Sequence, residues 1–370
     1  MSDAAVPAPG SDAAAAGHPA LHTAACSLFG VRTPIVQTGM GWVSGARLTA
    51  ATAAAGGLGI LASATMTPEE LRVAIGKVKA RTDAPFGVNL LPNQADLDER
   101  LVLLAAEAVP VVSFAGAPAA PVVARLHDAG AVVVVTVGAR RHAEKMAAIG
   151  VDALIAQGGE GGGHTGTVPT TLLLPAVVDA VQGSGIPVLA AGGFFDGRGL
   201  VAALAYGAAG VAMGTRFLLT RESHVPEAIK QTYLSTPVTG TVVTDAIDGA
   251  PQRVIRTAMI DALEKLPAAM RFPSAARNAL RFASSSGTPV KDLVRSGLEM
   301  RRAQELTWAQ LALAANAPMM TRAGVVEGRV DAGILPTGQV VGAIEEIPTV
   351  AELLERIMAE ASATLHRLAG

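Results

Sequence analysis

Residues 132–166 read VVVVTVGARRHAEKMAAIGVDALIAQGGEGGGHTG, and the class of fold can be inferred from them. Two continuous apolar runs, 132–137 and 153–156, flank an Ala-containing helical stretch that should end at Gly150. Continuous apolar runs, unlike alternating ones, are typical of strands that are buried on both faces of a sheet. The stretch therefore predicts a strand, a crossover helix and a second strand parallel to the first.

The same alternation of short apolar runs and Ala-rich helical stretches extends over most of the chain. The eight runs that we interpret as strands are 35–37, 58–61, 86–90, 109–114, 132–137, 153–156, 187–191 and 211–213. Thr67-Pro68-Glu69-Glu70 marks one helix start, because it combines a hydroxyl N-cap, an early Pro and a Glu three residues after the cap. The pattern predicts an α/β fold, a (β/α)8 TIM barrel, with a doubly wound open sheet as the alternative.

The chain divides into three parts by composition. Residues 1–20 hold almost no large apolar side chain, so we predict a disordered tail there. Residues 21–220, together with parts of 330–370, form the predicted barrel. Beyond residue 220 the alternation of short apolar runs and Ala-rich helical stretches stops. The region 221–330 is predicted to be an additional, mainly helical segment that binds substrate or covers the site, with helices at 226–234, 257–270 and 306–316.

The composition excludes several classes of protein. Basic and acidic residues number 29 and 31, so the chain as a whole does not attract a polyanion. The single cysteine, Cys26, excludes an internal disulfide framework and a Cys-based zinc site, and no His or Asp spacing suggests a metal. No apolar run approaches the roughly 18 residues of a membrane span. We expect a soluble, cytoplasmic protein without nucleic-acid or membrane partners.

Positive charge is concentrated in one segment. Residues 253–302 contain ten basic and four acidic residues and so carry a net charge of +6 on a nearly neutral chain. The segment is either a solvated helical face or a binding site for a small polyanionic ligand such as a coenzyme A moiety. The candidate substrate contacts are four arginines of this segment and one aromatic residue after the first strand: Arg253, Arg256, Arg301, Arg302 and Trp42.

Polar and glycine residues follow the ends of the predicted strands, where a barrel of this type binds its ligands. Gly192-Gly193 and Gly214-Thr215 end two strands that would be neighbours in the barrel. Backbone N–H groups in such turns can hold a phosphate without a lysine, although glycines kept only for tight turns are the alternative. The two loops together predict a phosphate site.

His164 is the strongest candidate for a catalytic base. It follows the glycine-rich loop 157–163, which lets the backbone approach a ligand closely. A neutral imidazole, with an unperturbed pKa of about 6.5, is suited to remove a proton next to an electron-withdrawing group. Four other histidines lie in or near the tail or on predicted helices and lack such a setting: His18, His22, His127 and His142.

Several motifs, in this order along roughly residues 25–235, resemble those of the nitronate monooxygenase family. They are TPIVQ (33–37), AGGLG (55–59), PFGVNL (85–90) and AQG (156–158), followed by GGH (162–164). The resemblance implies an FMN-dependent TIM barrel in which His164 is the catalytic base. The residues that we expect to bind the cofactor are Gly39, Met40, Asn89, Gln157, Gly162, Gly163, Gly192, Gly193, Gly214 and Thr215.

Two departures from the family's motifs flank the substrate position. The family's usual EAGGHRG reads EGGGHTG at 160–166, and the first loop is QTGMGW at 37–42. This version is most similar to a branch that oxidises a CoA thioester of a bicyclic hydroxy-indanone in steroid catabolism. We therefore expect dehydrogenation of a bulky acyl-CoA by proton abstraction and hydride transfer to the flavin. The alternatives are a nitronate monooxygenase, an enoyl-thioester reductase and a flavin-binding barrel without turnover, and the sequence leaves a homo-oligomer open.

Overall fold

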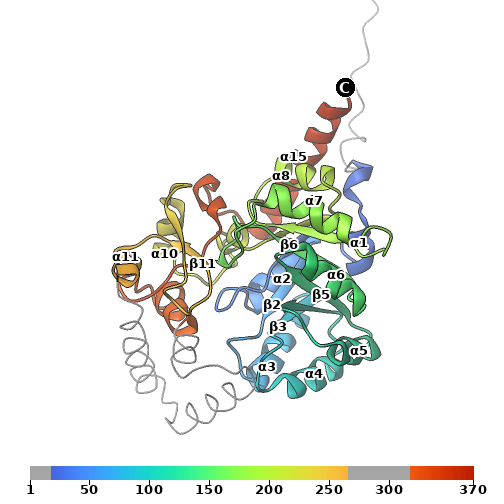
Figure 1. Ribbon diagram of the computed structural model, residues 1–370, viewed down its shortest axis with the longest axis horizontal. Helices are drawn as coiled ribbons and strands as arrows, with labels where there is room; N and C mark the ends of the chain where they lie inside the picture. Colours follow the sequence, from blue (N-terminus) through green and yellow to red (C-terminus); the bar gives the residue numbers. More distant parts are fainter. Residues whose placement is uncertain (1–17, 266–316) are drawn as a thin grey trace, which may run out of the picture.

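The computed structural model describes residues 18–265 and 317–370. Its centre is a closed barrel of eight parallel strands surrounded by helices (Figure 1). The strands are β1 (Ile35–Gln37), β2 (Leu58–Ala62), β3 (Phe86–Leu90), β4 (Val111–Ala115), β5 (Val132–Val137), β6 (Ala153–Gln157), β8 (Val188–Ala191) and β9 (Gly210–Met213). Pairing of β9 with β1 closes the barrel, which confirms the predicted (β/α)8 fold and excludes the open sheet.

The strands are buried on both faces because one set of side chains fills the barrel and the other meets the helices. Val36, Ile60 and Val134 belong to the inner cluster, together with Phe29 of α1 (Ala24–Phe29). Val135, the next residue along β5, belongs to the outer cluster under the helices. Each strand therefore needs apolar residues at successive positions, and this requirement made the strands visible in the sequence.

Helices cover the barrel, and α15 completes their layer. They are α2 (Ala46–Ala55), α3 (Pro68–Lys79), α4 (Leu97–Ala106), α5 (Ala120–Asp128), α6 (Arg140–Ala148), α7 (Thr170–Ala180), α8 (Gly197–Ala205), α9 (Thr215–Leu218) and α15 (Val350–Ala369), preceded by the short η1 (Pro19–Leu21). α15 packs against both α8 and α2. At Gly197 the approach of α15 leaves no space for a side chain, since a Cβ would meet the backbone of Glu360 and Ala361. Residues 350–369 therefore belong to the outer layer of the barrel.

The end of the predicted tail is placed against α15. Residues 1–17 lie outside the described part of the chain, but 18–20 lie within it. The backbone N–H of His18 donates to Ser362 Oγ at 3.3 Å, and its ring lies 5.0 Å from the ring of His366. The described chain thus contacts the barrel already three residues before Leu21, where we expected order to begin.

A lobe beside the barrel is formed by the described residues between 221 and 349 (Figure 1). It contains α10 (Glu227–Leu234), β10 (Thr241–Thr244), β11 (Gln252–Ile255), α11 (Ala258–Lys265), η2 (Arg322–Val326) and η3 (Gln339–Ala343). β10 and β11 form an antiparallel pair, and β11 also pairs with β7 (Gly163–His164), which comes from the loop after β6. The antiparallel pair differs from the mainly helical region that we predicted. Its strands are short and one face is partly exposed, so they lack the continuous apolar signal of the barrel strands. The helix predicted at 306–316 lies outside the described residues.

The two ends of the lobe meet where the chain leaves and re-enters the barrel. The backbone N–H of Arg221 donates to the carbonyl of Pro348 at 2.9 Å. The backbone N–H of Val350 donates to Glu222 Oε2 at 3.0 Å. The lobe is therefore inserted between α9 and α15 at a single point of the barrel.

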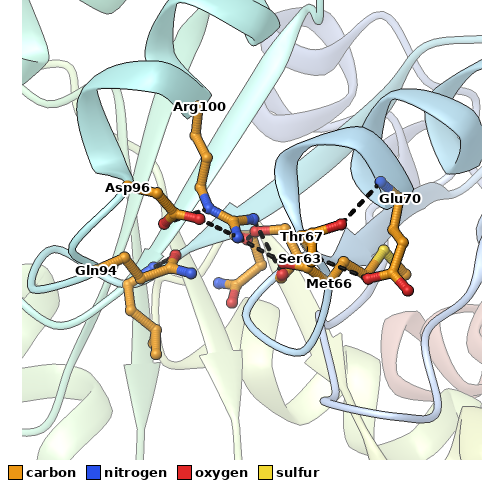
Figure 2. A network of polar contacts seen from close by, with 9 residues as sticks. Ser63, Met66, Thr67, Glu70, Gln94, Asp96 and Arg100 are labelled. Atoms are coloured by element: carbon orange, nitrogen blue, oxygen red, sulfur yellow. Dashed lines mark hydrogen bonds and ion pairs between the residues drawn. The ribbon is translucent and has the colours of Figure 1, made fainter. Parts of the chain in front are cut away.

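Arg100 fastens the loop after β2 to the start of α4 (Figure 2). Its side chain is only 2% exposed, and its Nε and Nη2 each donate to the carboxylate of Asp96 at 2.7 Å. Nη1 and Nη2 also donate to the carbonyls of Ser63 (3.1 Å) and Met66 (2.5 Å). Ser63 Oγ donates to the carbonyl of Asn89 at 2.6 Å. The network therefore holds the carboxyl ends of β2 and β3 in place.

The capping box predicted from the sequence lies in the same loop (Figure 2). Thr67 Oγ1 accepts from the backbone N–H of Glu70 at 3.2 Å, and Glu70 Oε2 accepts from the backbone N–H of Thr67 at 2.8 Å. These bonds satisfy two donors at the start of α3 that no helical carbonyl can reach. The loop after β2 is thus fixed at both of its ends.

Replacing Arg100 with Ala is expected to lower the free energy of unfolding by about 3 kcal/mol, because Asp96 and two carbonyls lose their donor together. Denaturant titration followed by circular dichroism measures the change. Arg72→Ala is the matched control: that arginine is 54% exposed, and its loss should change stability by no more than about 0.5 kcal/mol. Equal losses in the two variants would contradict a role for the buried network.

Candidate active site

His164 is held between the barrel and the lobe through its backbone. As part of β7 it is paired with Gln252 of β11, and the adjacent Gly163 is paired with Arg253. From the barrel side, Gln157 Nε2 at the end of β6 donates to the carbonyl of His164 at 2.7 Å. Gly163 has a φ of +64°, a conformation that glycine adopts without strain, and it lets the chain turn into this pairing.

The imidazole of His164 contacts a buried carboxylate of the lobe. His164 Nε2 lies 2.8 Å from Asp248 Oδ2; the histidine side chain is 64% exposed, whereas that of Asp248 is 8% exposed. Asp248 also accepts from Gln252 Nε2 and from the backbone N–H of Ala250. Burial raises the pKa of Asp248, but the hydrogen bonds from His164 and Gln252 outweigh it, so the pKa lies below its usual value. Asp248 is therefore an anion beside the imidazole.

The sequence did not point to Asp248. It is 84 residues from His164 and lies in the connection between β10 and β11, which were not predicted. A single aspartate in a segment without a predicted helix or strand gives no indication of a catalytic role. Only the β7–β11 pairing brings Asp248 next to His164.

The two glycine loops predicted to bind phosphate end β8 and β9, which are neighbours in the barrel. Gly192 and Gly193 have φ values of +94° and +88°, a region that other residues rarely enter. In the described residues no acceptor contacts the backbone N–H groups of Gly193, Gly214 and Thr215. These three unpaired donors at adjacent strand ends fit a phosphate oxygen cluster.

A short segment of the lobe, Thr337–Gln339, joins the β6 loop to the end of β9. The backbone N–H of Gly338 donates to Thr215 Oγ1, and that of Gln339 donates to the carbonyl of Glu160, both at 2.9 Å. Gly162 lies so close to Thr337 and Gly338 that it has no room for a Cβ. Sequence reasoning missed this segment because it lies far along the chain from both loops.

The remaining residues predicted to bind the cofactor come together at the same end of the barrel. A Cβ on Gly39 would collide with the side chain of Asn89, and one on Gly214 would lie 3.4 Å from Met40 Sδ. Asn89 Nδ2 donates to Ser113 Oγ at 3.0 Å, which fixes its amide beside the middle of β4. Strand ends that are remote in sequence are thus adjacent in space.

The residues predicted to bind substrate occupy different settings. Trp42 has a φ of +66°, its Nε1 donates to the carbonyl of Pro318 at 3.1 Å, and Arg322 lies 5.5 Å from its ring. Arg256 is exposed and forms an ion pair with Asp261. Arg301 and Arg302 lie outside the described residues.

Arg253 supports the glycine-rich loop. One of its terminal nitrogens, Nη2, donates to the carbonyl of Gly159 and the other, Nη1, to Thr241 Oγ1, both at 2.9 Å. The guanidinium is thus engaged with the protein itself. Its Nε is buried without a partner among the described residues.

Neither a metal centre nor a membrane span is found in the part of the chain that the structure describes. Within 18–265 and 317–370, no group of three or more His, Cys, Asp or Glu side chains could hold a metal ion. No helix in these ranges is long and apolar enough to cross a membrane.

Comparisons with known proteins identify the family and the fold of the chain. The sequence model of the family described as nitronate monooxygenase matches residues 22–102 and 93–360. A protein of Mycobacterium tuberculosis named "(3aS,4S,5R,7aS)-5-hydroxy-7a-methyl-1-oxo-octahydro-1H-indene-4-carboxyl-CoA dehydrogenase" is 57% identical over 92% of this chain and 96% of its own. A protein of Rhodococcus jostii with the same name is 54% identical over the same shares.

A solved structure gives the same result for the fold. FabK from Thermotoga maritima is 33% identical, with a TM-score of 0.74 over 94% of this chain and 98% of its own. The family model covers most of the chain, and the two relatives extend over nearly its whole length. The chain belongs to the nitronate monooxygenase family.

Proposed function

We propose that this oxidoreductase is an FMN-dependent dehydrogenase of a bulky acyl-CoA thioester, a hydroxy-indanone carboxyl-CoA from steroid degradation. The observation that carries the proposal is the exposed imidazole of His164, which follows the glycine-rich loop 157–163 and contacts the buried Asp248. The substrate is supported by the names of the two relatives that share more than half of their residues with this chain. Because a CoA thioester is an intracellular metabolite, we propose that the enzyme acts in the cytoplasm.

The donors at the ends of β8 and β9 fit FMN. The unpaired N–H groups of Gly193, Gly214 and Thr215 would receive its phosphate, and Gly39, Met40 and Asn89 would lie beside the remainder of the cofactor. When bound, FMN supplies an acceptor for a hydride from the substrate.

In this proposal His164 acts as the general base. The thioester carbonyl acidifies the hydrogen on the adjacent carbon, and the neutral imidazole removes it as a proton. A second C–H bond breaks on the neighbouring carbon as its hydride departs, and a C=C bond forms between the two carbons. The backbone contacts of His164 with Gln157 and Gln252 fix the position from which the base acts.

The large anionic part of the substrate would extend over the lobe. We assign contacts with the CoA phosphates to Arg256, Arg301 and Arg302, and contact with the acyl group or adenine to Trp42. Arg253 contributes indirectly, by holding the carbonyl of Gly159 in the loop that carries the base.

Anaerobic mixing of the FMN-loaded enzyme with the hydroxy-indanone carboxyl-CoA tests the proposal. We expect the visible absorbance of the oxidised flavin to be lost in a rapid, saturable phase. Free hydroxy-indanone carboxylate, which lacks CoA, is the control and should reduce the flavin far more slowly. Absence of bleaching with this and other acyl-CoA thioesters would contradict the proposal.

The activity that gives the family its name is the second candidate, because the family model matches most of the chain. Oxygen consumption with propionate-3-nitronate measures it directly. We expect a rate near background, since the sequence departs from the family's motifs beside the substrate position at 37–42 and 160–166. A high rate combined with no response to CoA thioesters would favour the nitronate substrate instead.

A further inference from the structure

We propose that Asp248 is a positioning residue that holds His164 in a single tautomer, with Nε2–H directed to the carboxylate and the lone pair of Nδ1 left for the substrate. The inference rests on the proposed function only in taking His164 as the base. Through Asp248, the lobe takes a direct part in the reaction proposed for the site at the end of the barrel.

The donors around Asp248 determine which ring nitrogen carries the proton. An ionised carboxylate can only accept hydrogen bonds, so the nitrogen 2.8 Å from Asp248 Oδ2 must be protonated. The other partners of this carboxylate, Gln252 Nε2 and the backbone N–H of Ala250, are also donors. In the neutral imidazole Nε2–H is thus the donor, and Nδ1 is the nitrogen that can take a proton.

The scaffold around the pair limits the movement of both side chains. Gln252 is the register partner of His164 in the β7–β11 pairing and also donates to Asp248. This one residue of β11 therefore fixes the position of both the His164 backbone and the Asp248 carboxylate. Gln157 fixes the histidine carbonyl from the barrel side. Because Asp248 is 8% exposed, water competes little for its oxygens.

No arginine or lysine neutralises Asp248 in the described part of the chain, where His164 is its ion-pair partner. The nearest cation along β11, Arg253, directs its guanidinium to Gly159 and Thr241. The charge of Asp248 is therefore available to stabilise the imidazolium that forms when His164 accepts a proton. The depressed pKa of Asp248 agrees with a carboxylate that stays ionised and does not take up the proton itself.

The variant Asp248→Asn keeps the shape of the side chain but presents an amide that can donate to Nε2 and so favour the opposite tautomer. We expect the rate of FMN reduction at saturating acyl-CoA to fall by about 10²–10⁴-fold, as is typical when a catalytic histidine loses its orienting carboxylate. KM should change by less than about threefold, because substrate contacts are untouched. Asp248→Glu, which retains the charge, should restore part of the rate.

The chain offers a matched control for these variants. His127 and Asp152 form a second His–Asp pair at 2.9 Å on the outer side of the barrel. Asp152→Asn removes the same chemical interaction there and should leave the rate of FMN reduction unchanged. Equal rates in Asp248→Asn and wild type, with FMN still bound, would overturn the proposal.

NMR of isotopically labelled imidazole nitrogens tests the tautomer without any turnover. In the FMN-loaded wild type we expect the His164 signals of a ring protonated at Nε2, identified by their absence in His164→Gln. A ring protonated at Nδ1 would overturn the proposal even if no Asp248 variant folds. An Nε2–H ring in an enzyme that no CoA thioester reduces would support the positioning role and reject the proposed substrate.

Discussion

Replacement of His164 with Ala is expected to slow the reduction of bound FMN by the acyl-CoA substrate by about 10²–10⁴-fold, the contribution typical of a positioned general base. The variant then lacks the imidazole that would accept the proton next to the thioester carbonyl. FMN content should stay close to that of wild type, because the hydrogen bond of the His164 side chain is with Asp248 of the lobe. Stopped-flow absorbance under anaerobic conditions, normalised to bound FMN, measures the effect.

Two further variants identify the cause of this loss. His164→Gln can keep a donor near Asp248 but cannot act as a base, so it should be as slow as His164→Ala while retaining the fold around the carboxylate. His127→Ala removes an exposed imidazole elsewhere on the barrel and should react at the wild-type rate. If His164→Ala reduces FMN as fast as wild type, another group removes the proton.

Gly162→Ala is expected to weaken FMN binding by at least about tenfold, which corresponds to about 1.4 kcal/mol. A Cβ at this position would come within 3.0 Å of the backbone of Thr337 and Gly338, closer than real Cβ atoms approach such atoms. The neighbours are backbone, so the segment itself must move, and such overpacking commonly costs about 1–3 kcal/mol. Movement of Gly338 breaks its hydrogen bond to Thr215 Oγ1 and displaces the adjacent phosphate donors.

FMN content after gel filtration and fluorescence titration of the apoprotein measure this change. Gly166→Ala lies in the same loop and is the control, because its Cβ would have only the carbonyl of Gly138 nearby, at 4.0 Å. It should bind FMN as wild type does. Wild-type affinity in Gly162→Ala would show that Thr337–Gln339 does not set the geometry of the phosphate loops.

The barrel could be predicted because the sequence pattern that identifies each of its strands lies within a short stretch of residues. In 132–137 and 153–156 every residue except Thr136 belongs to a hydrophobic cluster under a helix or inside the barrel, so burial on both faces appears as nearly continuous apolar sequence. The glycine loops were visible for a related reason. Ligand loops of a barrel follow strand ends, and Gly192, Gly193 and Gly214 stand at those positions.

The parts that were not predicted depend on pairing between distant segments. β10 and β11 are short, and no periodicity in 241–255 indicates that they pair with each other or that β11 pairs with β7. Asp248 reaches His164 only through that pairing, and Gly338 reaches Thr215 only because the chain returns to the barrel after the lobe. Sequence patterns indicated the proposed base and the proposed phosphate donors, whereas the residues that would orient them required three-dimensional structure.

The hydrogen bonds between Arg221 and Pro348 and between Val350 and Glu222 have an evolutionary consequence. The chain leaves the barrel and returns to it at one point. The sequence of the lobe can therefore change during evolution while the eight-stranded barrel keeps its structure. Changes within it would affect Asp248 and the proposed contacts with acyl-CoA at the same time. Relatives that share the barrel could thus diverge in substrate through changes in this one insertion, provided that Thr337–Gln339 keeps its contacts with the loops after β6 and β9.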